Sequence, residues 1–132
     1  MTITLPFASP SQNATSRWIW HRVTRHRDAV CWIVRQALAE RGVRAPWARI
    51  RPGERRKDAP ILGVAGRRVT IEVKRFNSGE LDLGNLIGGC KHIVDALMIE
   101  GLIFDDSPKW LTATYTQHPA KRGQGRTEIE IQ

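Results

Sequence analysis

The two ends of the chain alternate hydrophobic and polar residues as strands do. Residues 2–6 alternate threonine with isoleucine and leucine, so they predict a short strand with one buried face. The same alternation recurs over residues 110–115 and 127–131. Between these two runs, Lys121-Arg122-Gly123 marks a basic turn, so the tail is expected to form a hairpin.

Further strands are predicted in the middle of the chain. Apolar residues occupy alternate positions of residues 68–74, which places them on one face of a strand. Residues 61–64 form a second short run, and the turn at 65–66 between the two runs predicts another hairpin. Residues 45–50 could form an extra strand, whereas residues 51–60 have the composition of an exposed loop.

Two stretches show helical spacing instead. The first runs from near Thr24 to Arg41 and is ended by Gly42, and the second covers residues 85–99 and is ended by Gly101. Their apolar stripes are Ala29, Val30, Ile33, Val34, Ala37 and Leu38 in the first, and Leu86, Cys90, Ile93, Val94 and Leu97 in the second. The predicted order is therefore β-α-β-β-α-β-β, an α+β fold with two main helices packed on a mixed β-sheet.

Length and composition set the broad class. A chain of 132 residues suits one domain over residues 1–132, and 41% hydrophobic residues is ordinary for a globular protein. No apolar run approaches the roughly 18 residues of a membrane span. The N-terminal residues lack the pattern of a signal peptide, so we expect a cytoplasmic protein with no membrane partner. Cys31 and Cys90 fall on apolar helix faces and are expected to be buried, reduced thiols.

The charge changes the picture, because 21 Lys and Arg residues stand against 13 Asp and Glu residues. A net charge of +8 favours a polyanionic partner such as DNA, although many basic proteins bind no nucleic acid. The candidate phosphate contacts are Arg55, Arg56, Lys57, Lys74, Arg75, Lys121, Arg122 and Arg126.

Aromatic and basic residues also alternate before the first helix. Trp18 and Trp20 are interleaved with Arg17, His21 and Arg22. Tryptophans in this setting could stack on bases, or they could simply pack under the helix. Within the helix, Arg25, Arg27 and Arg35 could face DNA or only solvent.

Carboxylates flank the second predicted helix. Asp82 precedes it, and Asp105 and Asp106 follow it. The helix spans about 21 Å, and residues 102–106, if extended and antiparallel to it, reach back roughly 17 Å. Asp106 would then lie beside Asp82, and these acidic side chains could share one cation, with Lys91 projecting toward the same place.

Each of these residues also has a plainer interpretation. Asp82 suits the start of a helix, where the macrodipole favours negative charge. Asp105 and Asp106 could be loop residues before a proline turn. Lys91 could pair with Asp95, which follows one helical turn later.

The order of these features resembles the RusA family of Holliday-junction resolvases. Its members carry Asp-x-Asp-Asn-Leu, then a helix with a lysine and an Asp-Ala-Leu, and then Asp-Asp. This chain reads Asp82-Leu83-Gly84-Asn85-Leu86, then Lys91, then Asp95-Ala96-Leu97, and then Asp105-Asp106. Residues 2–6 are similar to the family's first strand and the tail to its closing hairpin. The resemblance covers most of the chain and is strong over residues 81–110.

This resemblance implies a homodimeric, Mg²⁺-dependent endodeoxyribonuclease that cuts four-way DNA junctions in recombination and repair, as such proteins from phages and prophages do. Asp82, Asp106 and Lys91 would be the catalytic residues, and Asp82, Asp105 and Asp106 would hold the metal. The ion would activate a water molecule and stabilise the leaving oxyanion. Lys91 would neutralise charge that develops on the phosphate.

The chain departs from the family pattern at one position, because Gly84 replaces the second aspartate of Asp-x-Asp-Asn. Either Glu80, Asp105 or Glu72 compensates, or the protein grips branched DNA and cuts it poorly. Gly88-Gly89, which are unfavourable inside a helix, predict a close backbone approach, either to the sheet or to a DNA phosphate. The four histidines form no recognisable triad and receive no role.

Overall fold

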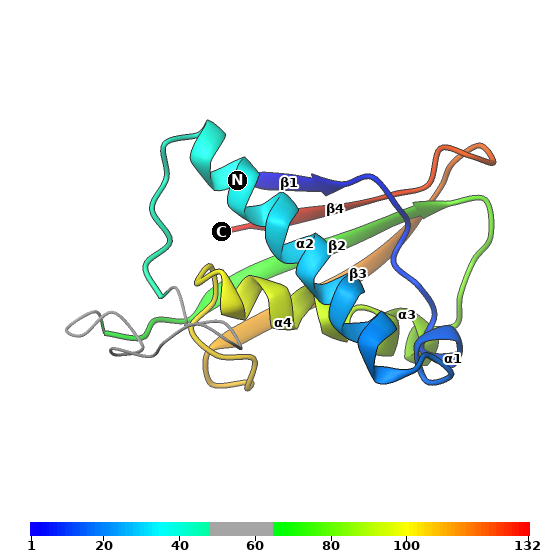
Figure 1. Cartoon of the computed structure of the whole chain (residues 1–132), viewed down its shortest axis with the longest axis horizontal. Coiled ribbons are helices and arrows are strands. Elements are labelled where there is room, and N and C mark those ends of the chain that lie inside the picture. The colour runs from blue at the N-terminus through cyan, green and yellow to red at the C-terminus, as the bar shows by residue number, and fades with distance from the viewer. Residues whose placement is uncertain (48–64) are drawn as a thin grey trace.

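The computed structural model describes residues 1–47 and 65–132 (Figure 1). The predicted strand over 61–64, residues 48–50 of the predicted strand over 45–50, and three candidate phosphate contacts therefore lie outside the described residues. These three contacts are Arg55, Arg56 and Lys57. Residues 45–47, the described half of the predicted strand over 45–50, are not in a strand.

The sheet contains four strands in the order β1-β4-β2-β3. Their bounds are Thr2–Leu5 for β1, Val69–Asn77 for β2, Leu111–Pro119 for β3 and Arg126–Ile131 for β4. Strands β2 and β3 run parallel over their whole length, whereas β4 is antiparallel to both β1 and β2. The predicted mixed sheet and α+β class are confirmed.

The prediction that the two strands of the tail form a closing hairpin is wrong. Strand β2 lies between β3 and β4, so the two tail strands are not neighbours. Alternation along a segment specifies which face is buried, but it does not specify the adjacent strand. Here β2 pairs with β3 on one edge, from Val69↔Leu111 to Asn77↔Pro119, and with β4 on the other.

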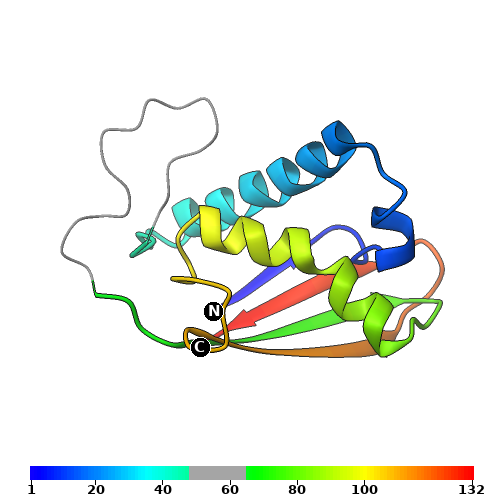
Figure 2. The same cartoon turned by 90° about the horizontal axis from the view of Figure 1, so that it is seen from below.

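The first long helix is α2, Trp20–Glu40, which begins four residues before the predicted start and is preceded by the short helix α1, Gln12–Thr15. The second predicted helix is divided into α3, Leu83–Gly89, and α4, Lys91–Ile99, which meet at Cys90. Figure 2 shows α2 and α4 on the same face of the sheet.

Two glycines immediately precede the break between α3 and α4. A Cβ atom at Gly89 would overlap the carbonyl oxygen of Pro10, which precedes α1. The predicted close backbone approach therefore exists, but its partner is the chain before α1, which neither alternative named. A Cβ atom at Gly88 would meet only the flexible side chain of Gln12.

Helix α4 ends as predicted, at Gly101. This residue has a φ of 81°, and the N–H groups of Gly101 and Leu102 donate to the carbonyls of Met98 and Leu97. The expected return strand over residues 102–106 is wrong, since this segment is irregular. Leu102 and Ile103 are buried one after the other, a pattern that a strand with one buried face does not produce.

The core lies between the helices and one face of the sheet. Its members are Ile3, Leu5, Ile71, Val73 and Ile129 from the sheet, Val30, Val34 and Leu38 from α2, and Ile93, Val94 and Leu97 from α4. Cys31 and Cys90 are buried and free of disulfides, as predicted. No helix of the described residues is both long enough and apolar enough to cross a bilayer.

Candidate functional site

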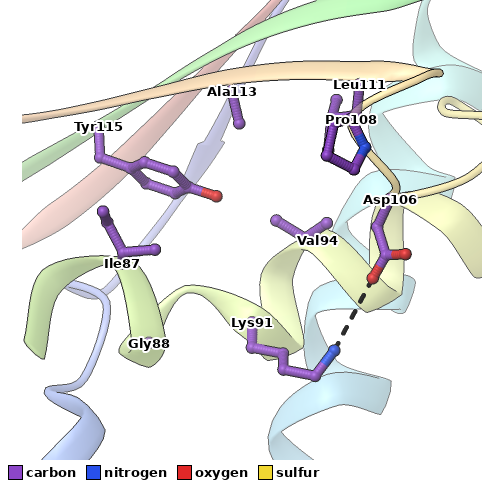
Figure 3. Close-up of a pocket in the computed structure, with 9 residues that line it drawn as sticks. All are labelled: Ile87, Gly88, Lys91, Val94, Asp106, Pro108, Leu111, Ala113 and Tyr115. Carbon is purple, nitrogen blue, oxygen red and sulfur yellow. Dashed lines mark ion pairs between the residues drawn. The ribbon is translucent and has the colours of Figure 1, made fainter. Parts of the chain in front are cut away.

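A pocket of about 320 Å³ opens between α3, α4, β3 and the loop that joins α4 to β3 (Figure 3). Its floor is mostly apolar, and its polar groups come from Lys91, Asp106 and Tyr115. Burial raises the pKa of Tyr115, so the phenol stays protonated and can donate a hydrogen bond. The lining residues are Ile87, Gly88, Lys91, Val94, Asp106, Pro108, Leu111, Ala113 and Tyr115.

Lys91 connects two carboxylates at this pocket. Its Nζ lies 3.3 Å from Oδ1 of Asp95. The same Nζ lies 3.8 Å from Oδ2 of Asp106 (Figure 3). The predicted pairing with Asp95 is therefore present, and Lys91 also projects toward Asp106. The Lys91 side chain is 65% exposed and that of Asp106 is 41% exposed, so both are accessible to a ligand.

Asp82 occupies a different environment, at the N-terminus of α3. Its carboxylate accepts hydrogen bonds from the backbone N–H of Asn85 at 3.0 Å and from Nδ2 of Asn85 at 2.7 Å. These two bonds lower the pKa of Asp82. Asp82 does not line the pocket. The plainer interpretation of Asp82, as a residue that starts a helix, is confirmed.

The expected meeting of Asp82 with Asp106 depended on a straight helix and an extended return. Instead, the return segment is a loop that brings Asp106 to Lys91, at the start of α4. Asp82 precedes α3, whose 7 residues rise about 10 Å before α4 begins. Asp105 accepts a hydrogen bond from the N–H of Ser107 at 3.3 Å, as a residue before a proline turn does.

No three acidic, histidine or cysteine side chains within residues 1–47 and 65–132 lie close enough to form a metal-binding group. The Mg²⁺ site of Asp82, Asp105 and Asp106 stays a prediction. Glu72, one suggested substitute for the missing aspartate, is 3.6 Å from Lys74 on the sheet face that the helices leave open. It therefore lies away from the pocket. Glu80 is exposed before α3.

The predicted phosphate contacts differ widely in accessibility. Arg75 is buried, with only 6% of its surface exposed, and donates to the carbonyls of Ser9 at 2.9 Å and Gly79 at 2.8 Å. Because its guanidinium is enclosed by these contacts, Arg75 is a structural residue that a phosphate cannot reach. Lys121 and Arg122 are exposed in the loop between β3 and β4.

Lys74 and Arg126 lie on the open sheet face beside glutamates. Lys74 is 2.9 Å from Glu130, which raises the pKa of Lys74, and Arg126 is 3.2 Å from Glu128. Their charges are already compensated, so these two residues are weaker candidates for DNA contacts than Lys121 and Arg122.

The structure distinguishes the two tryptophans near the start of α2, for which both base stacking and packing under the helix are possible from the sequence. Trp18 packs against His26, with ring centroids 5.3 Å apart, whereas Trp20 is 77% exposed. His26 in turn lies 6.1 Å from His92, the neighbour of Lys91. The histidine pair was missed because residues on two helices carry no spacing signal in the sequence.

The candidate site thus consists of Lys91, Asp106 and Tyr115 around one pocket, with the basic start of α2 on the other side of α4. Comparison with known proteins finds no matching family model and no matching curated protein, so the function of this chain has to be argued from these residues themselves.

Proposed function

We propose that this chain is a RusA-like, Mg²⁺-dependent endodeoxyribonuclease that acts on four-way DNA junctions in recombination and repair. One observation carries the proposal. Lys91 and Asp106, which the family resemblance assigns to a single catalytic site, meet at the mouth of one pocket 3.8 Å apart. The net charge of +8 supports a polyanionic substrate.

The pocket offers groups suited to a phosphodiester. Lys91 can place its ammonium group on a non-bridging phosphate oxygen and neutralise the charge that grows there during cleavage. The Tyr115 phenol is a second donor at the same pocket. Bound DNA would compete with Asp95 and Asp106 for the ammonium group of Lys91. The two ion pairs position this group at the pocket and leave it exposed.

The donors near the pocket also suit Mg²⁺. This ion takes oxygen ligands, keeps several waters, and is often held by one or two carboxylates together with substrate phosphates. Asp106 and the adjacent Asp105 would hold it, and DNA would complete its ligands. When bound, the ion would supply an activated water and stabilise the leaving oxygen. Asp82 is the weakest of the three predicted ligands because both of its oxygens are bound to Asn85.

A second function, binding of branched DNA with weak or no cleavage, is favoured by Gly84. This position lacks the carboxylate of the family pattern, and the neighbouring Asp82 is used as a helix cap.

Both functions predict a homodimer, because a four-way junction is two-fold symmetric and paired cuts need two related sites. Sedimentation that gives only a ~15 kDa species with and without DNA would contradict the dimer.

One experiment separates the two functions. A synthetic four-way junction and a linear duplex of the same arm sequence are incubated with the protein, with and without Mg²⁺, and binding is measured in parallel by gel shift. Cleavage of the junction that requires Mg²⁺ supports the enzyme, and binding alone supports the second function. Affinity should fall steeply with salt, as the release of counterions requires. Absence of DNA binding at low salt would overturn both functions.

A further inference from the structure

The start of α2 exposes a large apolar surface. Trp20 is 77% exposed and the preceding Ile19 is 59% exposed. The ring of Trp20 contacts His21 edge-on, at 5.8 Å between centroids. Exposing this much of an indole ring to water is unfavourable. An exposed apolar surface of this kind often marks a place where a partner binds.

The surroundings of Trp20 are strongly basic. Residues 17–27 include four arginines and no acidic residue before Asp28. Arg17, Arg22 and Arg25 are exposed, and none of them forms an ion pair with any carboxylate in the described part of the chain. Arg22 lies over the Trp18 ring, 4.5 Å from its centroid, which holds one positive charge close to the aromatic surface.

This basic surface adjoins the candidate site. The ring centroid of His26 on α2 lies 6.1 Å from that of His92, the residue after Lys91 on α4. Burial, together with the positive charges of His92 and Arg22, lowers the pKa of His26. The start of α2 therefore lies beside the start of α4, which carries Lys91 of the candidate site.

The charge decides which partner suits the surface. Two copies of this face brought together would confront three uncompensated arginines with three more, which is unfavourable. Nucleic acid supplies phosphates for the arginines, and its bases stack on aromatic rings. At a branch point, bases are less firmly stacked than within a duplex arm, so a protruding indole can reach them there.

We propose that Trp20 is a stacking platform for a base at the branch point of a DNA junction, with Arg17, Arg22 and Arg25 on the adjoining phosphates. This inference rests on the proposed function, since it assumes binding of branched DNA, and it identifies the residue that distinguishes a junction from a duplex. The junction selectivity then arises from α2, apart from the cleavage chemistry at Lys91 and Asp106.

The test measures the dissociation constants for a fluorescein-labelled four-way junction and for a linear duplex by anisotropy, in a buffer without Mg²⁺ so that cleavage does not interfere. Trp20→Ala should weaken junction binding about 5- to 100-fold, the range expected for loss of one stacked base. Duplex binding should change little. Trp20→Phe, which keeps an aromatic face, should recover most of the affinity.

Trp32 provides a matched control on the same helix. It is 58% exposed, but it has Asp28 one turn before it, and the nearby Arg35 is paired with Glu100 at 3.1 Å. Trp32→Ala should therefore leave the junction affinity unchanged. Circular dichroism melts confirm that each variant is folded, as expected for side chains that are mostly in water.

The outcomes distinguish this inference from the proposed function. If the native protein binds no DNA, both are overturned. If it binds junctions and Trp20→Ala binds them equally well, only the role of Trp20 is overturned. The role of Trp20 is also overturned if Trp20→Ala loses as much affinity for the duplex as for the junction. It is likewise overturned if Trp32→Ala loses as much junction affinity as Trp20→Ala does. A Trp20→Ala variant that changes from dimer to monomer would instead identify the surface as an interface between copies.

Discussion

The Nζ atom of Lys91 lies 3.8 Å from Oδ2 of Asp106, although Lys91 begins α4 and Asp106 lies in the loop that follows it. Both side chains are well exposed, and ion pairs of this kind contribute little to stability. Substitutions at either position should therefore leave the fold intact. Changes in DNA binding or cleavage can then be assigned to the site itself.

Asp106→Asn should abolish Mg²⁺-dependent junction cleavage and leave junction binding unchanged or tighter. The amide keeps the shape of the side chain but removes a charge that would hold the metal and repel phosphate. A cleavage assay and a gel shift on the same junction check both parts.

Asp95→Asn is the matched control for Asp106→Asn, because Asp95 also pairs with Lys91 but does not line the pocket. If the two variants lose cleavage equally, Asp106 acts only through the position of Lys91. Normal cutting by Asp106→Asn would remove it from the catalytic residues.

Lys91→Ala should slow junction cleavage more than it weakens junction binding. The ammonium group is expected to act on charge that appears only during the reaction, whereas other basic residues also hold the DNA. Single-turnover rates and dissociation constants measured on one junction give the two effects. The reverse result, weaker binding with a normal single-turnover rate, would make Lys91 a phosphate anchor.

Arg75→Ala should lower the free energy of unfolding by about 3 kcal/mol, since it leaves the carbonyls of Ser9 and Gly79 without their buried donor. Its neighbour Lys74 points to the open sheet face and pairs with Glu130, so Lys74→Ala should melt nearly as the native protein does. Urea titrations of the two variants provide the comparison. Equal stability of both would mean that the buried guanidinium contacts contribute nothing.

Much of the fold could be predicted because it depends on local patterns. Helical spacing identified α2 and the α3–α4 region, and the stop at Gly101 follows from a left-handed backbone that glycine favours. The pairing of strands could not be predicted in this way. The alternation of apolar and polar residues predicted that β3 and β4 are strands. The parallel pairing of β2 with β3 instead depends on the helices that pack across them.

The candidate site was predicted only in part for a related reason. Lys91 and Asp106 were placed together correctly, because the loop after Gly101 does return toward α4. Asp82 was placed beside them by treating residues 85–99 as one straight helix. The close approach of Pro10 to Gly89, beside the break between α3 and α4, is a contact between distant segments that no local pattern shows.

Gly89→Ala should be destabilising by about 2 kcal/mol or more, because its Cβ atom would meet a backbone carbonyl, that of Pro10, which cannot rotate away. Gly88→Ala is the matched control, since the flexible Gln12 side chain can move aside. Thermal melts of both variants test the difference. A Gly89→Ala protein as stable as Gly88→Ala would show that the chain before α1 shifts easily.

Stability should fall as the pH is lowered from 7.5 to 5.5. Burial, His92 and Arg22 lower the pKa of His26 below 6.5 in the folded protein, and burial also lowers that of His92. The unfolded chain therefore binds more protons below about pH 6.5, which favours unfolding. His26→Phe, which preserves the ring packing against Phe7 and Trp18, should reduce this dependence. A melting temperature of the native protein that stays the same from about pH 7.5 to 5.5 would contradict the predicted pH dependence.

Gly84 stands where the pattern of the RusA family has an aspartate. Gly84 lies in the first turn of α3 and is not among the glycines with positive φ, so an aspartate is compatible with its backbone. A Cβ atom there would be 3.5 Å from Oδ1 of Asp82, an ordinary contact. Negative charge in the first turn of a helix is also favourable.

Gly84→Asp should therefore fold and create a pair of carboxylates, which repel each other until a cation binds between them. Adding Mg²⁺ should raise its melting temperature more than that of the native protein. Gly84→Asn is the control, because it has nearly the same size but no charge. If Gly84→Asp gains no more from Mg²⁺ than Gly84→Asn does, position 84 does not contribute to a metal site. The remaining ligands would then have to come from Asp105 and Asp106.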